Sequence, residues 1–453
     1  MHSALEAVRQ VTLGTEYEGD LYLVGGYVRD DLLGIEPGND ADLVTTHDAP
    51  KLAELLNAKG LTDHAPVTYP RFGTAMVAIN GMDIEFVTAR RETYDPDSRK
   101  PNVEPATLEE DAARRDFTVN ALLRNLHDGR LTDPTGLGLA DLKVKLLRTP
   151  LDAGRTFRDD PLRMLRAVRF RWQLGFEAAP GLYDAIRQGA ERLKVISAER
   201  IKDELLRMLA RPTAADALAD LMQTGLIAQF APELVAMCGV EQGNYHHLDV
   251  WEHTLAAVRN LPPGDILLTL ATLLHDVGKP PTRMIDAKGQ TRFFSHEAVG
   301  AKMAADLLRR LKFSNEDVDT VARLVKNHMR LGSSPEFSAT AARCLIRDLG
   351  DDLPRLLELV EADAGALKVG VRVLDLSQIR QRIAEVQATT PREALDSPLS
   401  GEQIMDLLGV QAGPEVGRAK AFLLEQVLEG NLAPNDTESA KNFLQTYLQR
   451  SKS

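Results

Sequence analysis

Cysteine is nearly absent from this sequence, since only Cys238 and Cys344 occur among 453 residues. Two cysteines cannot build a disulfide framework, and their spacing is not that of a paired-cysteine metal site. We therefore expect both to be core thiols. Long apolar runs are also missing, because the stretch 266–274 falls well short of the roughly 20 residues of a membrane-spanning helix. With no signal-like N-terminus either, the sequence predicts a cytoplasmic protein without membrane contact.

Basic residues are in the minority, with 54 Lys and Arg against 66 Asp and Glu and a net charge of −12. This balance excludes a protein that coats nucleic acid over its whole surface, because phosphate binding depends on Lys and Arg. Any contact with RNA must be local. One short span concentrates arginine in this acidic chain: Arg155, Arg158, Arg163, Arg166, Arg169 and Arg171.

The spacing of apolar residues divides the chain into two kinds of structure. Short apolar runs at 21–24 and 74–79, mixed with helical stretches and glycine turns, predict strands with packed helices. From about residue 161 onward the apolar residues recur at helical spacing, which predicts an all-α remainder. The predicted fold class is α+β, a mixed β-sheet with helices followed by helical segments, and the length favours several domains.

A strand, a glycine turn and a helix follow one another around Gly25 and Gly26. Such a turn lets backbone N–H groups approach phosphate closely, and Arg29 would add charge on the same helix. Taken alone, a glycine pair after a strand is more often an ordinary tight turn. Further evidence is needed before this turn can be read as a phosphate site.

Acidic residues at alternate strand positions supply that evidence. Asp40 and Asp42 precede a β-prone segment and would project to one face, and a third strand at 83–87 would add Asp83 or Glu85. Like charges on one face are costly, and a pair of divalent metal ions would relieve the repulsion. Any one of these acids alone would be read as an ordinary surface residue.

Five segments, in order, resemble the motifs of bacterial CCA-adding enzymes and of their relatives, the bacterial poly(A) polymerases: 25–30 (GGYVRD), 40–42 (DAD), 84–90 (IEFVTAR), 114–121 (RRDFTVNA) and 158–163 (RDDPLR). Asp159 stands where the family has glutamate, which leaves Asp160 and Arg163 intact. Residues 91–101 correspond to the family's loop that helps to switch from C to A addition, which favours full CCA addition here.

The resemblance makes Asp40 and Asp42 the catalytic carboxylates that hold Mg²⁺. From the strand pattern, Glu85 is predicted as the third catalytic carboxylate. Asp160 and Arg163 would read the incoming base through its Watson–Crick edge, so that selection needs no nucleic-acid template. A solvated basic helix face is the plain alternative for the arginine row, and the order of the motifs argues against it. The implied nucleotide-binding set is Gly25, Gly26, Arg29, Arg115, Asp160, Arg163, Arg166 and Arg169.

Histidine is concentrated in one part of the chain, with six of the ten residues between 246 and 328. The segment 275–279 (HDVGK) resembles the signature of HD phosphohydrolases, and a lone helical histidine would usually be structural. Imidazole and carboxylate together suit a transition metal such as Mn, Ni, Co or Fe. The resemblance implies four ligands, a possible second metal on two further histidines, and a lysine that meets phosphate: His253, His275, Asp276, Asp363; His296, His328; Lys279.

The resemblance covers nearly the whole chain and implies four domains: a nucleotidyltransferase head at 1–146, a helical neck with nucleotide- and RNA-binding arginines at 147–235, an HD domain at 236–370 and a tRNA-binding helical tail at 371–453. The implied activity is template-independent addition of C and A from CTP and ATP to the 3′ end of tRNA, with release of pyrophosphate, plus a phosphohydrolase activity of the HD domain. The alternatives are a poly(A) polymerase or a CC-adding or A-adding enzyme. A metal phosphohydrolase and a noncatalytic RNA-binding module are more distant readings.

Overall fold

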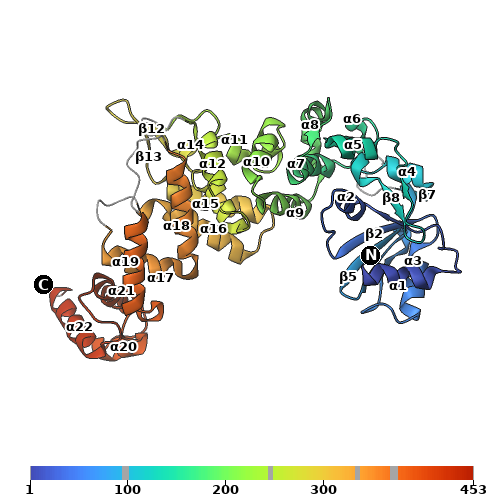
Figure 1. The fold of residues 1–453 in the computed structure, drawn as a ribbon. Coiled ribbons are helices and arrows are strands. Elements are labelled where there is room, and N and C mark those ends of the chain that lie inside the picture. The colour runs from blue at the N-terminus through green and yellow to red at the C-terminus, as the bar shows by residue number, and fades with distance from the viewer. Residues whose placement is uncertain (1, 94–101, 243–247, 332–336, 368–375, 452–453) are drawn as a thin grey trace. The chain divides into compact units, whose positions relative to one another are not determined.

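The computed structural model describes residues 2–93, 102–242, 248–331, 337–367 and 376–451. The chain divides into two compact units, Met1–Pro232 and Glu233–Ser453, which we describe separately as unit 1 and unit 2 (Figure 1). The four finer domain boundaries stay a prediction. Part of the loop predicted to switch from C to A addition, residues 94–101, lies outside the described residues.

Unit 1 is built on a seven-stranded sheet with the order β3-β4-β5-β2-β1-β8-β9. β2 and β5 run parallel, and every other neighbouring pair is antiparallel. The strands predicted at 21–24, 74–79 and 83–87 correspond to β1, β4 and β5. The bounds are β1 (Tyr22–Val24), β2 (Asp40–Thr45), β3 (Val67–Tyr69), β4 (Thr74–Ile79), β5 (Met82–Thr88), β8 (Leu123–Asn125) and β9 (Leu131–Thr132).

The two faces of this sheet differ because alternate strand residues point to opposite sides. One face is fully buried, as Leu43 and Phe86 show, and α3 (Ala49–Ala58) packs on β4 and β5 there. The other face carries Asp42 and Glu85, which lie opposite each other across the parallel pair. Burial of the apolar face therefore fixes the acids on the open face.

The hairpin between β4 and β5 closes on a two-residue turn. Asn80 and Gly81 both have positive φ, 52° and 72°, and Ile79 faces Met82 as the last pair. Asn-Gly is the preferred sequence for such a turn because both central residues must adopt left-handed backbone conformations. The turn sets the register of the two strands.

The rest of unit 1 is mainly helical. Leu165 and Val168 of α7 (Leu162–Leu174) are fully buried, and α7 packs on α9 (Ala198–Leu209), which begins after the N-cap Ser197. Two small strand pairs accompany the helices, β6 (Arg90–Thr93) with β7 (Asn102–Pro105) and β10 (Leu146–Leu147) with β11 (Glu177–Ala178). The other helices are α1 (Ser3–Thr12), α2 (Gly26–Leu32), α4 (Leu108–Ala113), α5 (Gly138–Val144), α6 (Ala153–Asp159), α8 (Leu182–Gly189) and α10 (Ala214–Gln223).

Unit 2 is a stack of helices with one small hairpin. The hairpin, β12 (Arg283–Ile285) with β13 (Thr291–Phe293), departs from the all-α expectation for this part of the chain. Within the described ranges, every helix is too short or too polar to cross a membrane. The helices are α11 (Pro232–Val235), which begins at the unit boundary, α12 (Val250–Arg259), α13 (Ile266–Leu274), α14 (Lys279–Thr282), α15 (His296–Arg310), α16 (Asn315–Asn327), α17 (Ala339–Leu349), α18 (Leu353–Gly365), α19 (Leu376–Thr389), α20 (Gly401–Leu408), α21 (Pro414–Glu429) and α22 (Thr437–Ser451).

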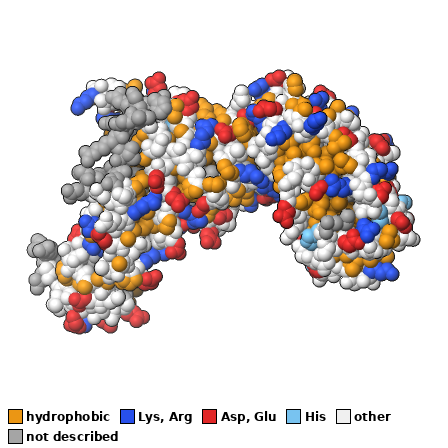
Figure 2. Space-filling model, viewed as in Figure 1, with side chains coloured by type: hydrophobic (Ala, Val, Ile, Leu, Met, Phe, Trp, Pro, Cys, Tyr) orange, Lys and Arg blue, Asp and Glu red, His pale blue; other side chains and the backbone are white. Residues whose placement is uncertain are grey.

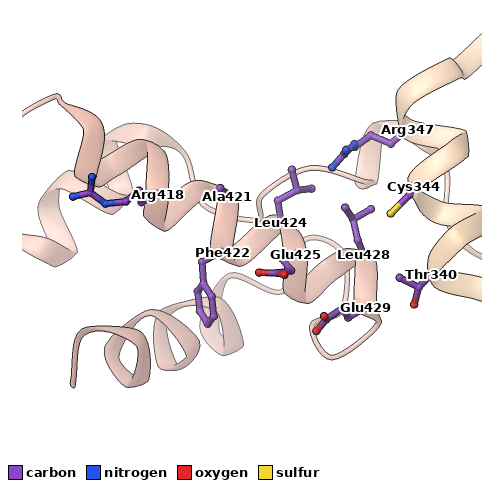
Figure 3. Close-up of a pocket in the computed structure, with 10 residues that line it drawn as sticks. All are labelled: Thr340, Cys344, Arg347, Arg418, Ala421, Phe422, Leu424, Glu425, Leu428 and Glu429. Carbon is purple, nitrogen blue, oxygen red and sulfur yellow. The ribbon is translucent and has the colours of Figure 1, made fainter. Parts of the chain in front are cut away.

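Neither cysteine is a core thiol, so that prediction was wrong. Cys238 is exposed and Cys344 is half-buried. Cys344 lines a groove of about 710 Å³ between α17 and α21, where it and Arg347 face Leu424 and Leu428 (Figure 3). This groove contains none of the predicted site residues.

Candidate functional sites

The glycine turn of unit 1 lies directly against one of the predicted carboxylates. Gly25 is the N-cap of α2 and has φ 76°, a conformation that other residues rarely adopt. A Cβ atom added to Gly25 would lie 3.0 Å from Oδ2 of Asp42. The position therefore requires glycine both for its backbone conformation and for the close approach of the carboxylate.

The acids of the open sheet face form a negatively charged cluster. Asp40 lies opposite Asp83 in the parallel register, and Asp42 lies opposite Glu85. Loss of solvent raises the pKa of Asp42; Arg115 lowers it, and the Asp40 charge raises it further. Loss of solvent and the charge of Asp42 likewise raise the pKa of Glu85. Carboxylate oxygens that repel one another are a donor set that fits a hard divalent cation.

Arg115 is held beside this cluster by a buried acid. Asp111 is 1% exposed and accepts a hydrogen bond from Nε of Arg115 over 3.2 Å, and it also pairs with Arg114 at 2.6 Å. Burial alone would raise the pKa of Asp111, but the guanidinium groups of Arg115 and Arg114 lower it. Asp111 therefore stays charged and fixes Arg115 within electrostatic reach of Asp42.

Two of the predicted arginines are anchored by buried acids that sequence reasoning missed. Arg166 forms an ion pair of 2.6 Å with Asp116, and Arg169 forms one of 2.5 Å with Glu204. Burial alone would raise the pKa of Asp116, but Arg166 and a hydrogen bond from Asn120 lower it to about 2. Arg166 also acts on Asp42, whose pKa it lowers.

Three of the predicted arginines lie close to one aromatic ring. The guanidinium carbons of Arg29, Arg166 and Arg169 lie 5.0, 5.1 and 4.1 Å from the ring centroid of Phe170. Arg29 is 3% exposed and donates to Oδ1 of Asn120 over 2.7 Å. The structure thus gathers these arginines on one side of unit 1 and gives each a protein partner.

The predicted base-reading pair lies at the junction of α6 and α7. Oδ2 of Asp160 accepts a hydrogen bond from Arg200 over 3.2 Å. Arg163 is 9% exposed, and its Nη2 donates to the carbonyl oxygen of Arg114 over 2.5 Å. The two side chains are neighbours in sequence but are held by different partners.

Unit 2 brings together all six predicted HD residues. Within each of two groups of three, the ligand atoms lie within 4.8 Å of one another: His253, His275 and Asp363 form one group, and Asp276, His296 and His328 form the other. Asp276 lies between them, with Oδ2 3.2 Å from Nε2 of His275 and Oδ1 3.4 Å from Nε2 of His296.

Backbone carbonyls fix the orientation of three imidazole rings. Nδ1 of His275, His296 and His328 lies 2.6 to 2.9 Å from the carbonyl oxygen three residues earlier. Because a carbonyl only accepts, Nδ1 carries a proton and Nε2 faces the carboxylates. Nε2 of His275 is buried and makes no well-aligned hydrogen bond, although Oδ2 of Asp276 lies 3.2 Å away. A buried ring nitrogen without a good hydrogen bond, next to carboxylates, is a ligand set that fits a divalent cation.

The charges of this cluster are strongly coupled. Burial alone would lower the pKa of His275, but the charges of Asp276 and Asp363 raise it to about 10. In return, His275 and Lys279 hold the pKa of Asp276 well below its usual range, although burial opposes them. A bound cation would take the place of the proton on Nε2 of His275.

Two features around the HD cluster carried no signal in the sequence. Lys279 lies 2.7 Å from Oδ2 of Asp276 and donates to Oε1 of Gln242 over 2.6 Å, so Gln242 positions the predicted phosphate-binding lysine. Ser295 has φ 59°, a left-handed conformation that is rare without glycine, directly before His296. This local turn starts α15 at the histidine.

Family models match three successive parts of this chain. Residues 21–148 match the "Poly A polymerase head domain", residues 175–238 match the "Probable RNA and SrmB- binding site of polymerase A", and residues 244–375 match the "HD domain". The first match contains the carboxylates and Arg115, and the third contains the six HD residues.

Relatives with established names match over most of their length. A CC-adding tRNA nucleotidyltransferase of Thermus thermophilus is 37% identical over 94% of this chain and 93% of its own. An A-adding tRNA nucleotidyltransferase of Deinococcus radiodurans is 39% identical over 76% of this chain and 80% of its own. A multifunctional CCA protein of Xanthomonas campestris is 31% identical over 89% of this chain and 99% of its own.

Solved structures share the fold across the whole chain. The CCA-adding enzyme of Bacillus stearothermophilus in complex with CTP matches with a TM-score of 0.69 and 25% identity, and each chain is fully covered. The CCA-adding enzyme of Thermotoga maritima complexed with tRNA matches with a TM-score of 0.59 at 20% identity, which supports the fold alone.

Proposed function

Because the chain belongs to the family of tRNA nucleotidyltransferases with a poly(A) polymerase head, we propose that it adds C and A from CTP and ATP to the 3′ end of tRNA and that its full product is CCA. The observation that carries the proposal is the register of Asp42 opposite Glu85, with Gly25 so close that a Cβ atom built on it would lie 3.0 Å from Oδ2 of Asp42. This geometry supports a carboxylate centre next to a phosphate-binding turn.

In the reaction, the 3′-hydroxyl oxygen of the RNA attacks the α-phosphorus, a P–O bond forms, and the bond to the bridging oxygen breaks to release pyrophosphate. Asp40 and Asp42, with Glu85 beside them, would hold two Mg²⁺. When bound, these ions lower the pKa of the attacking hydroxyl and neutralise charge on the leaving group. Positioning of the two substrates supplies most of the remaining acceleration.

The residues around the carboxylates would orient the nucleoside triphosphate. Gly25 and Gly26 open the N-terminus of α2, where backbone N–H groups can receive phosphate oxygens. Arg29 would act through its charge and through its bond to Asn120, which fixes α2 behind the turn. Arg115 would neutralise phosphate charge next to Asp42.

Base selection would come from protein side chains alone. Asp160 presents acceptor oxygens and Arg163 presents donors, so together they can match the Watson–Crick edge of cytosine or adenine. Arg166 and Arg169 would position this pocket through their ion pairs with Asp116 and Glu204. Because both are already paired, direct phosphate contact by these two arginines would require an exchange of partners.

The HD cluster would hold a transition metal, Mn, Ni, Co or Fe, on His253, His275, Asp276 and Asp363, with His296 and His328 available for a second ion. Such a centre activates water toward a phosphate ester when it is loaded. Lys279, held by Gln242, would meet the phosphate group of that substrate. This second activity is compatible with the HD domain that the chain contains.

A partial product is the second candidate, because one relative that spans nearly the whole chain is named CC-adding and another is named A-adding. Product mapping separates the candidates: the purified protein is given tRNA transcripts that end before CCA, after C and after CC, with CTP and ATP alone and together. Ordered addition of C, C and A supports the full enzyme. A stop at CC, or addition of A alone, supports the specialised enzymes, and long A tails on unrelated RNA support a poly(A) polymerase.

A further inference from the structure

The open face of the unit 1 sheet continues past the carboxylates into exposed apolar side chains. Val67 and Tyr69 of β3 and Met76 of β4 are 48%, 48% and 47% exposed, and we call them the apolar strip. Exposed apolar residues that cluster at one place on a protein usually mark an interaction surface. Figure 2 shows one face of the molecule, where hydrophobic side chains gather in patches among acidic and basic ones.

The register of the sheet joins this strip to the carboxylates. Val67 lies opposite Met76, Met76 lies opposite Glu85, and Glu85 lies opposite Asp42. Tyr69 points to the same face as Val67 because it is two residues further along β3. Neighbouring strands are about 4.8 Å apart, so the strip begins one strand away from Glu85.

The carboxylates therefore lie between two different surroundings. On the β1 side, the Gly25 turn at the start of α2 is the proposed site of the triphosphate. On the β4 and β3 side, the strip offers an aromatic ring and aliphatic surface, which suit the flat faces of nucleobases. Nucleotide transfer needs both substrates at the metal site from opposite sides, and the glycine turn occupies only one of them.

A basic residue completes the strip at its outer end. Arg71 follows Tyr69 by two residues and is exposed, and its guanidinium lies 6.0 Å from the ring of Phe72. Aromatic and aliphatic platforms flanked by arginine are typical of surfaces that bind single-stranded nucleic acid.

We propose that the apolar strip, Val67, Tyr69 and Met76, binds the unpaired terminal nucleotides of the RNA that accepts the new nucleotide, and that Arg71 contacts their phosphates. The proposal rests on the proposed function, because it assigns the second substrate of the same carboxylate centre. Tyr69 would stack on a terminal base and thereby hold the 3′-hydroxyl near Glu85 and Asp42.

Photo-crosslinking tests the proposal without depending on catalysis. The full-length protein is irradiated with a tRNA transcript that lacks CCA and carries 4-thiouridine as its last nucleotide, with no nucleoside triphosphate present. We expect crosslinked peptides that contain Tyr69 or Met76. Crosslinks confined to other segments would overturn the proposal for the strip, even if the protein adds nucleotides. Crosslinks at the strip in a protein that adds no nucleotides would uphold the proposal for the strip and refute the proposed function.

Kinetics of strip variants give the second test. Loss of stacking in Tyr69→Ala should raise KM for tRNA on the order of 10-fold, while KM for CTP and the rate at saturating tRNA stay close to wild type. Tyr69→Phe should behave as wild type, and so should Leu139→Ala, which removes another exposed apolar side chain of unit 1. An unchanged KM for tRNA in Tyr69→Ala would overturn the proposal. A wild-type dimer that Tyr69→Ala converts to a monomer would overturn it as well, because the strip would then be a dimer interface.

Discussion

Arg166 and Asp116 form a 2.6 Å ion pair inside unit 1, between α7 and the segment that follows α4. The pair links the arginine-rich helix to the part of the head that carries Arg115. Asp116 is 8% exposed, so it depends on this partner and on Asn120 to remain charged. A structural role for the RRDFTVNA segment follows, in addition to its proposed role in nucleotide binding.

Asp116→Asn should lower the free energy of unfolding by about 2 kcal/mol at neutral pH, because it removes the main charged partner of the Arg166 guanidinium, whose side chain is 30% exposed. The pKa of Asp116 is lowered to about 2, so its contribution is present above the ordinary carboxyl pKa and is lost as the pH falls from about 4 to about 2. Urea unfolding followed by Trp172 fluorescence in a Trp251→Phe background measures this, and the two proteins should converge in stability at low pH. Asp184→Asn, which breaks the exposed pair with Arg187, should change stability by less than about 0.5 kcal/mol.

Gly25→Ala should abolish most nucleotide addition while the protein stays folded. The new Cβ would meet Oδ2 of Asp42 at 3.0 Å and displace the carboxylate. Gly34→Ala is the matched control, since Gly34 has a similar φ of 71° but open space around it. Both variants should lose about 1 kcal/mol of stability from backbone strain. Equal activity of the two variants in a CTP addition assay would contradict the proposed role of the close approach.

Glu85→Gln should reduce the rate of nucleotide addition far more than Asp83→Asn. Glu85 lies opposite Asp42 and its pKa is raised by loss of solvent and by that neighbour, whereas Asp83 is exposed and lies opposite Asp40. Both changes preserve size and remove one charge. Initial rates across a range of Mg²⁺ concentrations measure the difference, and a larger loss in Asp83→Asn would make Asp83 the third carboxylate.

Asp276→Asn should lower transition-metal binding at both groups of the HD cluster, because this carboxylate faces His275 and His296 at once. His253→Gln should affect only the group that contains Asp363. Metal content after incubation with Mn²⁺ or Ni²⁺, measured by mass spectrometry, gives the stoichiometry. Nucleotide addition should be unchanged in both variants; a shared loss would contradict two independent sites.

Ser295→Gly should preserve the HD cluster, and Ser295→Val should damage it. A β-branched residue at φ 59° is strained by about 1–3 kcal/mol, and glycine is not. The strain would fall on the residue before His296, so metal binding and thermal stability should drop together in the valine variant. Normal metal binding in Ser295→Val would show that the turn does not position His296.

The parts of this protein that follow local rules could be predicted from its sequence. A short apolar run indicated β4, and the order of short motifs indicated the carboxylate, arginine and HD sets. Glu204 could not be predicted as the partner of Arg169, because 35 residues separate them and no spacing rule applies. The division of the HD residues into two groups depends on which ring nitrogen faces which acid, and backbone carbonyls decide that. Cys344 was misplaced because a helix exposes part of its surface to a groove that the sequence does not show.

The Asn80-Gly81 turn has a consequence for how this protein tolerates insertions and deletions. Because strand side chains alternate with a period of two, one residue added to β5 on the carboxylate side of the turn would shift every following residue to the other face. Glu85 would then point into the apolar layer against α3, and Phe86 would point toward the substrates. A length change within β5, without any substitution at the proposed site, would thus abolish the activity, so natural variation in chain length is expected to avoid this strand.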